Sequence, residues 1–256
     1  MSDLILPSDL ITTLQHARHL AVLTGAGISA ESGIPTFREA QTGLWANYSP
    51  EDLATPEAFR RNPKLVWDWY TWRRELVAKA EPNAGHRALV GLAQLVPRLT
   101  LITQNVDGLH TRAGSTDVIE LHGNLTRCTC LAAGHLVDAA LVDAALPGET
   151  AVSPPLCPHC GSPLRPDVVW FGENLPRAAL QQAVAASQSC DLFLSVGTSS
   201  LVQPAASLPL EALERGKTAV EINPQPTPLA PYMDYVLRGS AGTVLPALVA
   251  ALDPGG

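Results

Sequence analysis

The sequence has few basic residues and no long apolar run. Lys and Arg number 17 among 256 residues, against 24 Asp and Glu, which gives a formal net charge of −7. This balance argues against a general affinity for nucleic acid, which depends on clustered Lys and Arg. No stretch approaches the roughly 18 uncharged apolar residues of a membrane span, and the first ten residues are acidic where a signal peptide would be basic. We therefore expect a cytoplasmic protein, a monomer, with neither nucleic acid nor membrane as a partner.

Cysteine is also scarce, and its placement is uneven. Five cysteines are present, and four of them form two close pairs. A secreted disulfide framework would spread an even number of cysteines along a shorter chain, so the pattern favours a reducing compartment. The fifth, Cys190, precedes an apolar run and is expected to be a buried core thiol.

Short apolar runs predict a parallel sheet. They recur at residues 20–24, 99–103, 117–121, 191–196 and 218–222, and the later ones alternate with helix-like segments at 177–188 and 204–215. The runs are almost wholly apolar rather than alternating, as in strands buried on both faces. The predicted fold class is therefore α/β, with a Rossmann-like parallel sheet and helices on both faces.

Two stretches interrupt this rhythm. Residues 35–63 are rich in Pro, Asn, Ser and aromatics, which indicates a long loop that enters a helical insertion. Residues 127–166 hold the paired cysteines and predict a small separate module. The expected organisation is a Rossmann-like domain made of residues 1–34, 83–122 and 171–256, a cofactor-binding loop and helical insertion at 35–82, and the small module at 123–170.

A glycine turn follows the first apolar run. The pattern Gly25-x-Gly27-x-x-Ala30 at the end of a buried strand is typical of a dinucleotide phosphate site at the start of a helix. Gly25 permits the tight turn, Gly27 lets the backbone approach the pyrophosphate, and Ala30 allows close packing. A conventional dehydrogenase would add a second strand ending in an acidic residue about 20 positions on. That residue is missing here, so the following loop is expected to grip the cofactor instead.

The cysteine pairs predict a metal site, so the small module is expected to bind zinc. Cys157-Pro158-His159-Cys160 has the two-residue spacing that lets both thiolates reach one tetrahedral ion. Cys128 and Cys130 are separated by a single residue, where two or more are usual. We expect a structural zinc ion held by Cys128, Cys130, Cys157 and Cys160. An incomplete site, or help from His135 or His159, is the alternative.

Six motifs, in this order, resemble those of the sirtuin family. They are Gly25-Ala26-Gly27-Ile28-Ser29, Gly33-Ile34-Pro35-Thr36-Phe37-Arg38, Thr103-Gln104-Asn105-Val106-Asp107, His122-Gly123, Val169-Trp170-Phe171-Gly172-Glu173 and Gly197-Thr198-Ser199. Sirtuins are NAD-dependent protein-lysine deacylases with a Rossmann-like large domain and a zinc-binding module. The resemblance therefore implies that acylated lysines of proteins are the substrates and that NAD is consumed, giving nicotinamide and O-acyl-ADP-ribose.

The resemblance also implies roles for individual residues. His122 follows an apolar strand, where a histidine can act as a base or can simply be satisfied by hydrogen bonds; the family match makes it the general base. Asn105, the other expected catalytic residue, would hold the nicotinamide carboxamide together with Asp107. The expected NAD-binding residues are Gly25, Ala26, Gly27, Ser29, Ala30, Thr36, Phe37, Arg38, Trp45, Gln104, Asn105, Val106, Asp107, Gly197, Thr198, Ser199, Asn223, Pro224, Gln225 and Ala241.

One further pattern concerns the acyl group. Tyr70 and Arg73 are three positions apart in a segment, 63–80, that is expected to be a helix, so they share one face. More commonly, the Tyr of such a pair packs against the core and the Arg is exposed to solvent. The pair nonetheless matches the sirtuin class III pattern, whose members remove acidic acyl groups, with Ala54 at a position that widens the acyl pocket. The expected substrate-binding residues are Ala54, Tyr70, Arg73, Val169, Trp170, Phe171, Gly172 and Glu173.

The expected activity is thus removal of succinyl and malonyl groups, and more weakly of acetyl groups. Three other functions share parts of the pattern. They are plain protein-lysine deacetylation, mono-ADP-ribosyl transfer, and a catalytically silent module that binds NAD or ADP-ribose. A silent module would tolerate loss of His122 or Asn105, and both are present.

Overall fold

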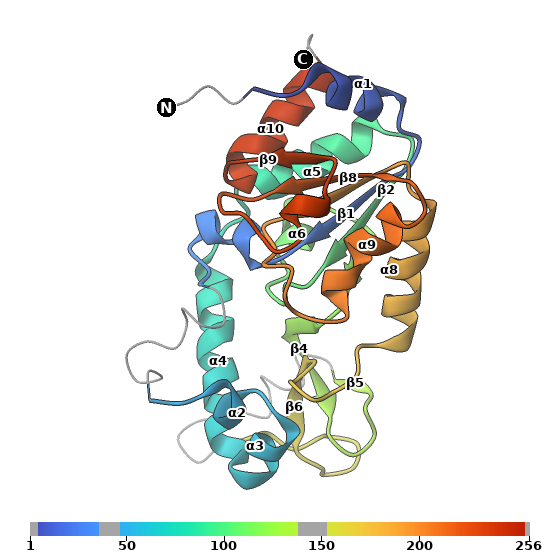
Figure 1. The fold of residues 1–256 in the computed structure, drawn as a ribbon. Helices are drawn as coiled ribbons and strands as arrows, with labels where there is room; N and C mark the ends of the chain where they lie inside the picture. Colours follow the sequence, from blue (N-terminus) through green and yellow to red (C-terminus); the bar gives the residue numbers. More distant parts are fainter. Residues whose placement is uncertain (1–4, 36–46, 138–152, 254–256) are drawn as a thin grey trace.

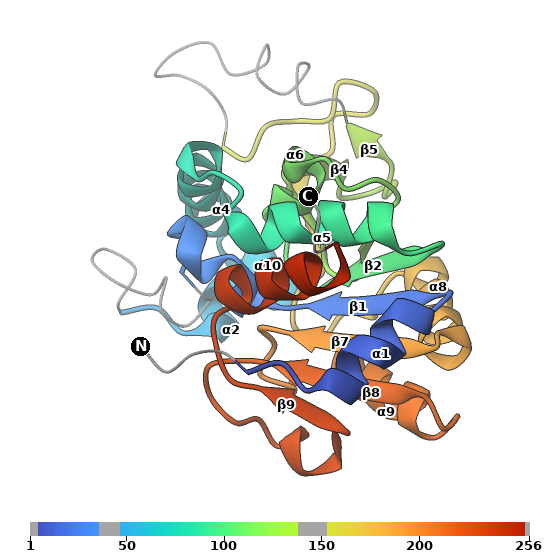
Figure 2. The same ribbon diagram turned by 90° about the horizontal axis from the view of Figure 1, so that it is seen from above.

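The large domain is built on one parallel sheet. The structure, a computed structural model, describes residues 5–35, 47–137 and 153–253. In these ranges six strands run in the order β3-β2-β1-β7-β8-β9, and all pair in parallel. Figure 2 shows β2, β1, β7, β8 and β9 side by side in this order. The strands are β1 (Leu20–Thr24), β2 (Leu99–Thr103), β3 (Ile119–Glu120), β7 (Leu192–Val196), β8 (Thr218–Ile222) and β9 (Tyr235–Leu237).

Helices bury both faces of this sheet, as the apolar runs predict. Leu20 and Val22 of β1 face a core formed with α1 (Ser8–His16), α5 (Ala84–Leu95) and α10 (Ala241–Leu252). Ala21 and Leu23 face the opposite core, with α8 (Arg177–Ser189) and α9 (Leu208–Leu213). Cys190 belongs to the second core, and burial raises the pKa of its thiol to about 11. The predicted fold class and the buried Cys190 are confirmed.

A helical insertion extends away from the sheet. It consists of α2 (Pro50–Leu53), α3 (Pro56–Arg61) and α4 (Pro63–Lys79), which lie in the lower half of Figure 1. α4 starts where expected, since Pro63 stands at its first position and the side chain of Asn62 accepts a hydrogen bond from the Leu65 N–H. The helix packs against the small module, so its residues reach from one part of the protein to the other.

The small module is a three-stranded antiparallel sheet. Its order is β5-β4-β6, with β4 at Gly123–Cys130, β5 at Leu136–Val137 and β6 at Leu164–Val168. Gly123, which directly follows His122, has a φ of +79°, and a Cβ atom there would collide with the Asp167 carbonyl oxygen. Only glycine fits at this corner. The sharp entry into the module therefore fixes where His122 stands.

Some local predictions were wrong. The glycine turn does not begin an α-helix but leads into two 3₁₀ turns, η1 (Ala26–Ile28) and η2 (Ala30–Ser32). Segment 204–215 is split into η4 (Ala205–Ser207) and α9, and the run 117–121 forms only the short β3. Helices α1, α5, α6 (Leu109–Ala113) and α10, the turn η5 (Ala230–Tyr232) and strand β9 were not predicted. Among the described residues, no helix combines the length and apolarity that a bilayer crossing requires.

Candidate active site

Two loops meet at the carboxyl ends of the central strands. β1 and β7 are neighbours, and the strand order reverses direction between them, which is where open α/β sheets bind ligands. The Gly27 N–H donates to the Gly197 carbonyl oxygen at 2.7 Å. Cβ atoms added to Gly25 or Gly27 would lie 2.8 Å or less from atoms of Thr198 or Gly197. These glycines therefore let the loop after β1 press against the loop after β7.

Thr198 joins this point to two further strands. Its hydroxyl accepts a hydrogen bond from Gln104 Nε2 at 3.0 Å, and its carbonyl accepts one from Asn223 Nδ2 at 2.9 Å. Gln104 follows β2 and Asn223 follows β8. The structure thus brings Gly25, Gly27, Gln104, Gly197, Thr198 and Asn223 of the predicted NAD residues to one edge of the sheet. Amide and hydroxyl groups of this kind suit the hydroxyl-rich riboses of a dinucleotide.

A polar network lies beside the glycine turn. The Ser29 hydroxyl donates to Asp107 Oδ2 at 2.7 Å, while Asn105 Nδ2 donates to Ser29 Oγ and to the Gly25 carbonyl, both at 3.1 Å. Asp107 is buried and also accepts from the Leu109 N–H at 2.9 Å. The predicted residues Ser29, Asn105 and Asp107 are therefore held in fixed orientations. Their carboxylate and amide oxygens are the acceptors that a carboxamide NH₂ needs.

His86 is part of this network and was missed by the sequence reasoning. Its Nε2 lies 3.4 Å from Ser29 Oγ, and its Nδ1 accepts a hydrogen bond from the Asn83 N–H at 3.3 Å. Because Nδ1 accepts, the proton of the neutral ring resides on Nε2. Burial lowers the pKa of His86, and the Asp107 carboxylate opposes that shift. The available signal was a histidine three positions after Asn83, the spacing of a capping box.

His122 stands at the same edge, between the two domains. Its Nδ1 lies 2.9 Å from the Gln104 carbonyl oxygen, and its own carbonyl accepts a hydrogen bond from the Val169 N–H at 2.9 Å. Burial lowers the pKa of His122, and the bond to Gln104 opposes the shift without cancelling it. The ring is therefore neutral near pH 7, the state in which imidazole can accept a proton.

The pair on α4 belongs to the helical insertion. Tyr70 is 2% exposed, and burial raises its pKa to about 12. Arg73 is half-buried, and burial lowers the pKa of its guanidinium, while interactions with Tyr70 and with the Asp107 carboxylate counteract that shift. The guanidinium carbon of Arg73 lies 5.9 Å from the centroid of the Trp69 ring on the same helix. Ala54 is 2% exposed, and its carbonyl accepts from the Phe171 N–H at 2.9 Å.

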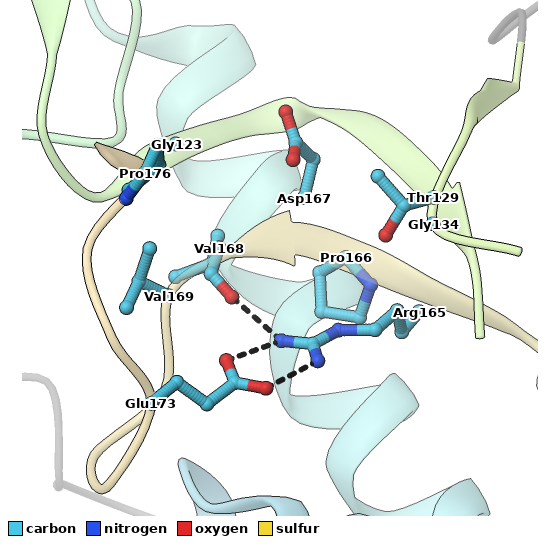
Figure 3. A pocket seen from close by; sticks show the side chains of 10 residues that line it. All are labelled: Gly123, Thr129, Gly134, Arg165, Pro166, Asp167, Val168, Val169, Glu173 and Pro176. Atoms are coloured by element: carbon cyan, nitrogen blue, oxygen red, sulfur yellow. Dashed lines mark hydrogen bonds and ion pairs between the residues drawn. The ribbon is translucent and has the colours of Figure 1, made fainter. Parts of the chain in front are cut away.

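An ion pair stiffens the loop after β6. Figure 3 shows Arg165 pointing at Glu173, with Nη1 and Nη2 donating to the two carboxylate oxygens at 2.6 and 2.8 Å. Arg165 Nη2 also donates to the Val168 carbonyl, and its guanidinium stacks 3.6 Å from the centroid of the Trp170 ring. Glu173 in turn accepts from the Trp170 N–H at 2.8 Å. Phe171, at the tip of the loop, is 53% exposed.

The other predicted NAD residues have different placements. Thr36, Phe37, Arg38 and Trp45 lie outside the described residues. Pro224 and Gln225 follow β8 and are exposed, whereas Ala241 is buried at the start of α10.

The carboxylate of Glu31 accepts hydrogen bonds from the Ser240 hydroxyl and from the Gly242 N–H, which connects the start of α10 to the glycine turn.

Three of the four predicted zinc ligands converge. The Sγ atoms of Cys130, Cys157 and Cys160 all lie within 4.8 Å of one another, and those of Cys130 and Cys160 are 3.5 Å apart. Three thiolates at this separation fit a structural zinc ion. Cys128 is not part of the cluster, and its Sγ lies 3.2 Å from Nη1 of Arg74, which donates to it.

Known proteins match the chain over nearly its whole length. The model of the Sir2 family matches residues 25–204. An NAD-dependent protein deacylase of Methylococcus capsulatus is 54% identical over 246 residues, which are 95% of this chain and 96% of that protein. A solved Sir2 homologue in complex with NAD is 47% identical, with a TM-score of 0.88, over 98% of this chain and 95% of its own. A Sir2 complex with a p53 peptide and NAD is 32% identical, with a TM-score of 0.83, over 95% and 97% of the two chains.

Proposed function

The chain belongs to the Sir2 family of NAD-dependent protein deacylases, and we propose that it removes succinyl and malonyl groups from protein lysines in preference to acetyl groups. The reaction consumes NAD as a substrate. The acyl oxygen replaces nicotinamide at C1′ of the ribose, and a ribose hydroxyl then attacks the acyl carbon. One water molecule is consumed as the bond to the lysine nitrogen breaks, so the products are free lysine, nicotinamide and O-acyl-ADP-ribose.

His122 is the proposed general base. Its buried, neutral ring holds one nitrogen against the Gln104 carbonyl, and the other is free to take the proton of a ribose hydroxyl. Asn105 and Asp107 are the proposed partners of the nicotinamide carboxamide. Both are pre-oriented through Ser29, so little rearrangement is needed when the substrate binds.

The observation that carries the acyl preference is the position of Arg73. Its guanidinium carbon lies 5.9 Å from the centroid of the Trp69 ring, one turn from Tyr70 on the same helix, and its charge interacts with Tyr70 and the Asp107 carboxylate. A half-buried guanidinium can grip a carboxylate by two parallel hydrogen bonds, and only succinyl and malonyl groups carry that carboxylate. Ala54 is buried and hydrogen-bonded through its carbonyl to the Phe171 N–H. Its small side chain is proposed to leave room for the acyl group.

The proposed substrate peptide lies along the loop of residues 169–173. The ion pair between Arg165 and Glu173 holds this loop, and the Val169 N–H ties it to His122. A fixed loop suits an extended peptide that pairs strand to strand. The hydrogen bond between Val169 and His122 would also fix the position of the substrate lysine relative to the proposed base.

The test is a comparison of three matched peptides that differ only in the acyl group on one lysine. The protein is incubated with NAD and an acetyl-, a succinyl- or a malonyl-lysine peptide, and loss of the acyl mass is followed. We expect turnover of all three, fastest for succinyl and malonyl. Acetyl turnover that exceeds both acidic groups would refute the proposal. Nicotinamide release without any peptide turnover would instead favour ADP-ribosyl transfer.

A further inference from the structure

The two halves of the cysteine cluster are built on turns of the same kind. In the first, the Gly134 N–H donates to the Cys130 carbonyl at 2.8 Å; in the second, the Gly161 N–H donates to the Cys157 carbonyl, also at 2.8 Å. Both glycines have positive φ angles, +68° and +73°. Each turn therefore starts at a cysteine and ends at a left-handed glycine four residues later.

Matching the two turns residue by residue locates a missing ligand. Cys160 stands three positions after Cys157 and supplies the second thiolate of its turn. The residue three positions after Cys130 is Ala133, which has no ligand atom. The first turn therefore provides one thiolate instead of two, and the cluster needs a fourth donor from elsewhere.

Cys128 is poorly placed to be that donor. It lies two residues before the first turn, within β4, and its Sγ accepts a hydrogen bond from Arg74. Arg74 is itself held by the Thr71 hydroxyl and by the ring of Trp67, whose centroid is 4.6 Å from the guanidinium carbon. Cys128 thus belongs to the contact between β4 and α4.

His135 contacts one member of the cluster, Cys157, although, like Cys128, it is not in the group whose ligand atoms all lie within 4.8 Å of one another. It directly follows Gly134, and its carbonyl accepts from the Cys130 N–H at 2.9 Å, which closes the hairpin between β4 and β5. Its Nε2 lies 3.6 Å from Cys157 Sγ. With zinc bonds of the usual length, a nitrogen and a sulfur ligand on one tetrahedral ion are about 3.6 Å apart, and two sulfurs about 3.8 Å. The separation between His135 and Cys157 is therefore that of two ligands on one ion.

We propose that the structural zinc ion is held by Cys130, Cys157, Cys160 and His135, with His135 in place of Cys128. The rival histidine is His159, whose ring centroid is 5.4 Å from that of His135. His159 lies between the two cysteines of the second turn and is exposed. Four protein ligands complete a tetrahedral site and leave no open position, so this ion would support the module and take no part in catalysis.

The test measures zinc rather than activity. Purified wild-type protein, His135→Ala, His159→Ala and Cys128→Ser are assayed for zinc per chain and for the rate at which a coloured chelator removes it. We expect one zinc per chain in the wild type and wild-type behaviour for His159→Ala and Cys128→Ser. His135→Ala should lose zinc at least about tenfold faster, since even an outer-sphere partner of a ligand is typically worth 10–100-fold in affinity. Circular dichroism checks that the Rossmann-like domain of each variant stays folded.

A rescue variant and cobalt substitution test the ligand assignment without relying on zinc loss from His135→Ala. Because Ala133 occupies the place that Cys160 has in the other turn, Ala133→Cys combined with His135→Ala should restore slow zinc release. Cobalt absorption should then change from that of three thiolates and an imidazole to that of four thiolates. The proposal is overturned if His135→Ala retains zinc like the wild type, if Cys128→Ser or His159→Ala loses it instead, or if the wild type holds none.

Discussion

The Nδ1 atom of His122 lies 2.9 Å from the carbonyl oxygen of Gln104. A carbonyl oxygen can only accept, so Nδ1 carries the proton of the neutral ring and Nε2 is the nitrogen with a free lone pair. Gln104 is the first residue after β2, and His122 follows β3, the neighbouring strand. Two paired strands therefore fix both the position and the tautomer of the proposed base.

Replacement of His122 by Tyr should abolish deacylation without unfolding the protein. A positioned general base typically contributes 10²–10⁴-fold, so we expect kcat to fall by at least about a hundredfold. The measurement is peptide turnover at saturating NAD, with the melting temperature as the control for folding. Residual turnover above a tenth of the wild-type rate would contradict the role.

The pH profile of the wild type tests the same role. Burial lowers the pKa of His122, with the Gln104 carbonyl opposing, and the net shift is downward from 6.5. A base must be unprotonated, so kcat/KM should rise with pH and level off above the pKa of His122. We expect the acid limb below pH 6.5. A limb at or above that value would mean that burial does not control the titrating group.

Gly27→Ala should destabilise the protein, and Gly91→Ala should not. A Cβ atom on Gly27 would lie 2.7 Å from the Gly197 carbonyl oxygen, so one of the two loops must move, at a cost of about 1–3 kcal/mol in unfolding free energy. In contrast, Gly91 is in α5, where a Cβ atom would meet Val249 methyl groups at 3.6 and 3.7 Å. There, alanine should raise the unfolding free energy by about 0.5–1 kcal/mol. Denaturant unfolding compares the two variants, and equal effects would refute the steric account.

Arg165→Met should weaken binding of the peptide and spare binding of NAD. The substitution retains a long apolar side chain over Trp170 but removes the bonds to Glu173 and Val168, which leaves the Glu173 carboxylate without its cation. We expect KM for the peptide to rise several-fold, with KM for NAD unchanged. Arg165→Lys retains the charge, so its KM for the peptide should lie between those of the wild type and Arg165→Met. An unchanged peptide KM, or an equal rise for NAD, would show that the loop does not depend on this ion pair.

Strands could be predicted from the sequence where burial alone decides the structure. The bounds of β1, β2 and β8 agree with their apolar runs to the residue, because strands covered by helices on both faces consist mostly of apolar residues. β9 has only three residues and gives no such signal. α10 contains Pro246, which locally indicates a helix break, yet the helix continues on the core formed with α5.

The candidate site was predictable to the extent that it follows strand ends. Asn105, Asp107 and His122 come within four residues of the ends of apolar runs, so their placement at one edge of the sheet follows from its topology. Contacts made by side chains from distant segments were not predictable. The spacing of Cys128 and Cys130 predicts a pair of ligands, yet the strand directs Cys128 to Arg74, a residue that nothing in the local sequence connects to it.

The most direct test of the account compares two activities in the wild type and in two variants of Arg73. The kcat/KM values for succinyl-lysine and acetyl-lysine peptides are measured for the wild type, for Arg73→Lys and for Arg73→Met. If Arg73 binds the acyl carboxylate through two bonds, Arg73→Met should lose about a hundredfold or more on the succinyl peptide and stay within about threefold on the acetyl peptide. Arg73→Lys, which cannot form the paired bonds, should be intermediate on the succinyl peptide. Equal loss of both activities, or a succinyl activity that survives Arg73→Met, would contradict the account.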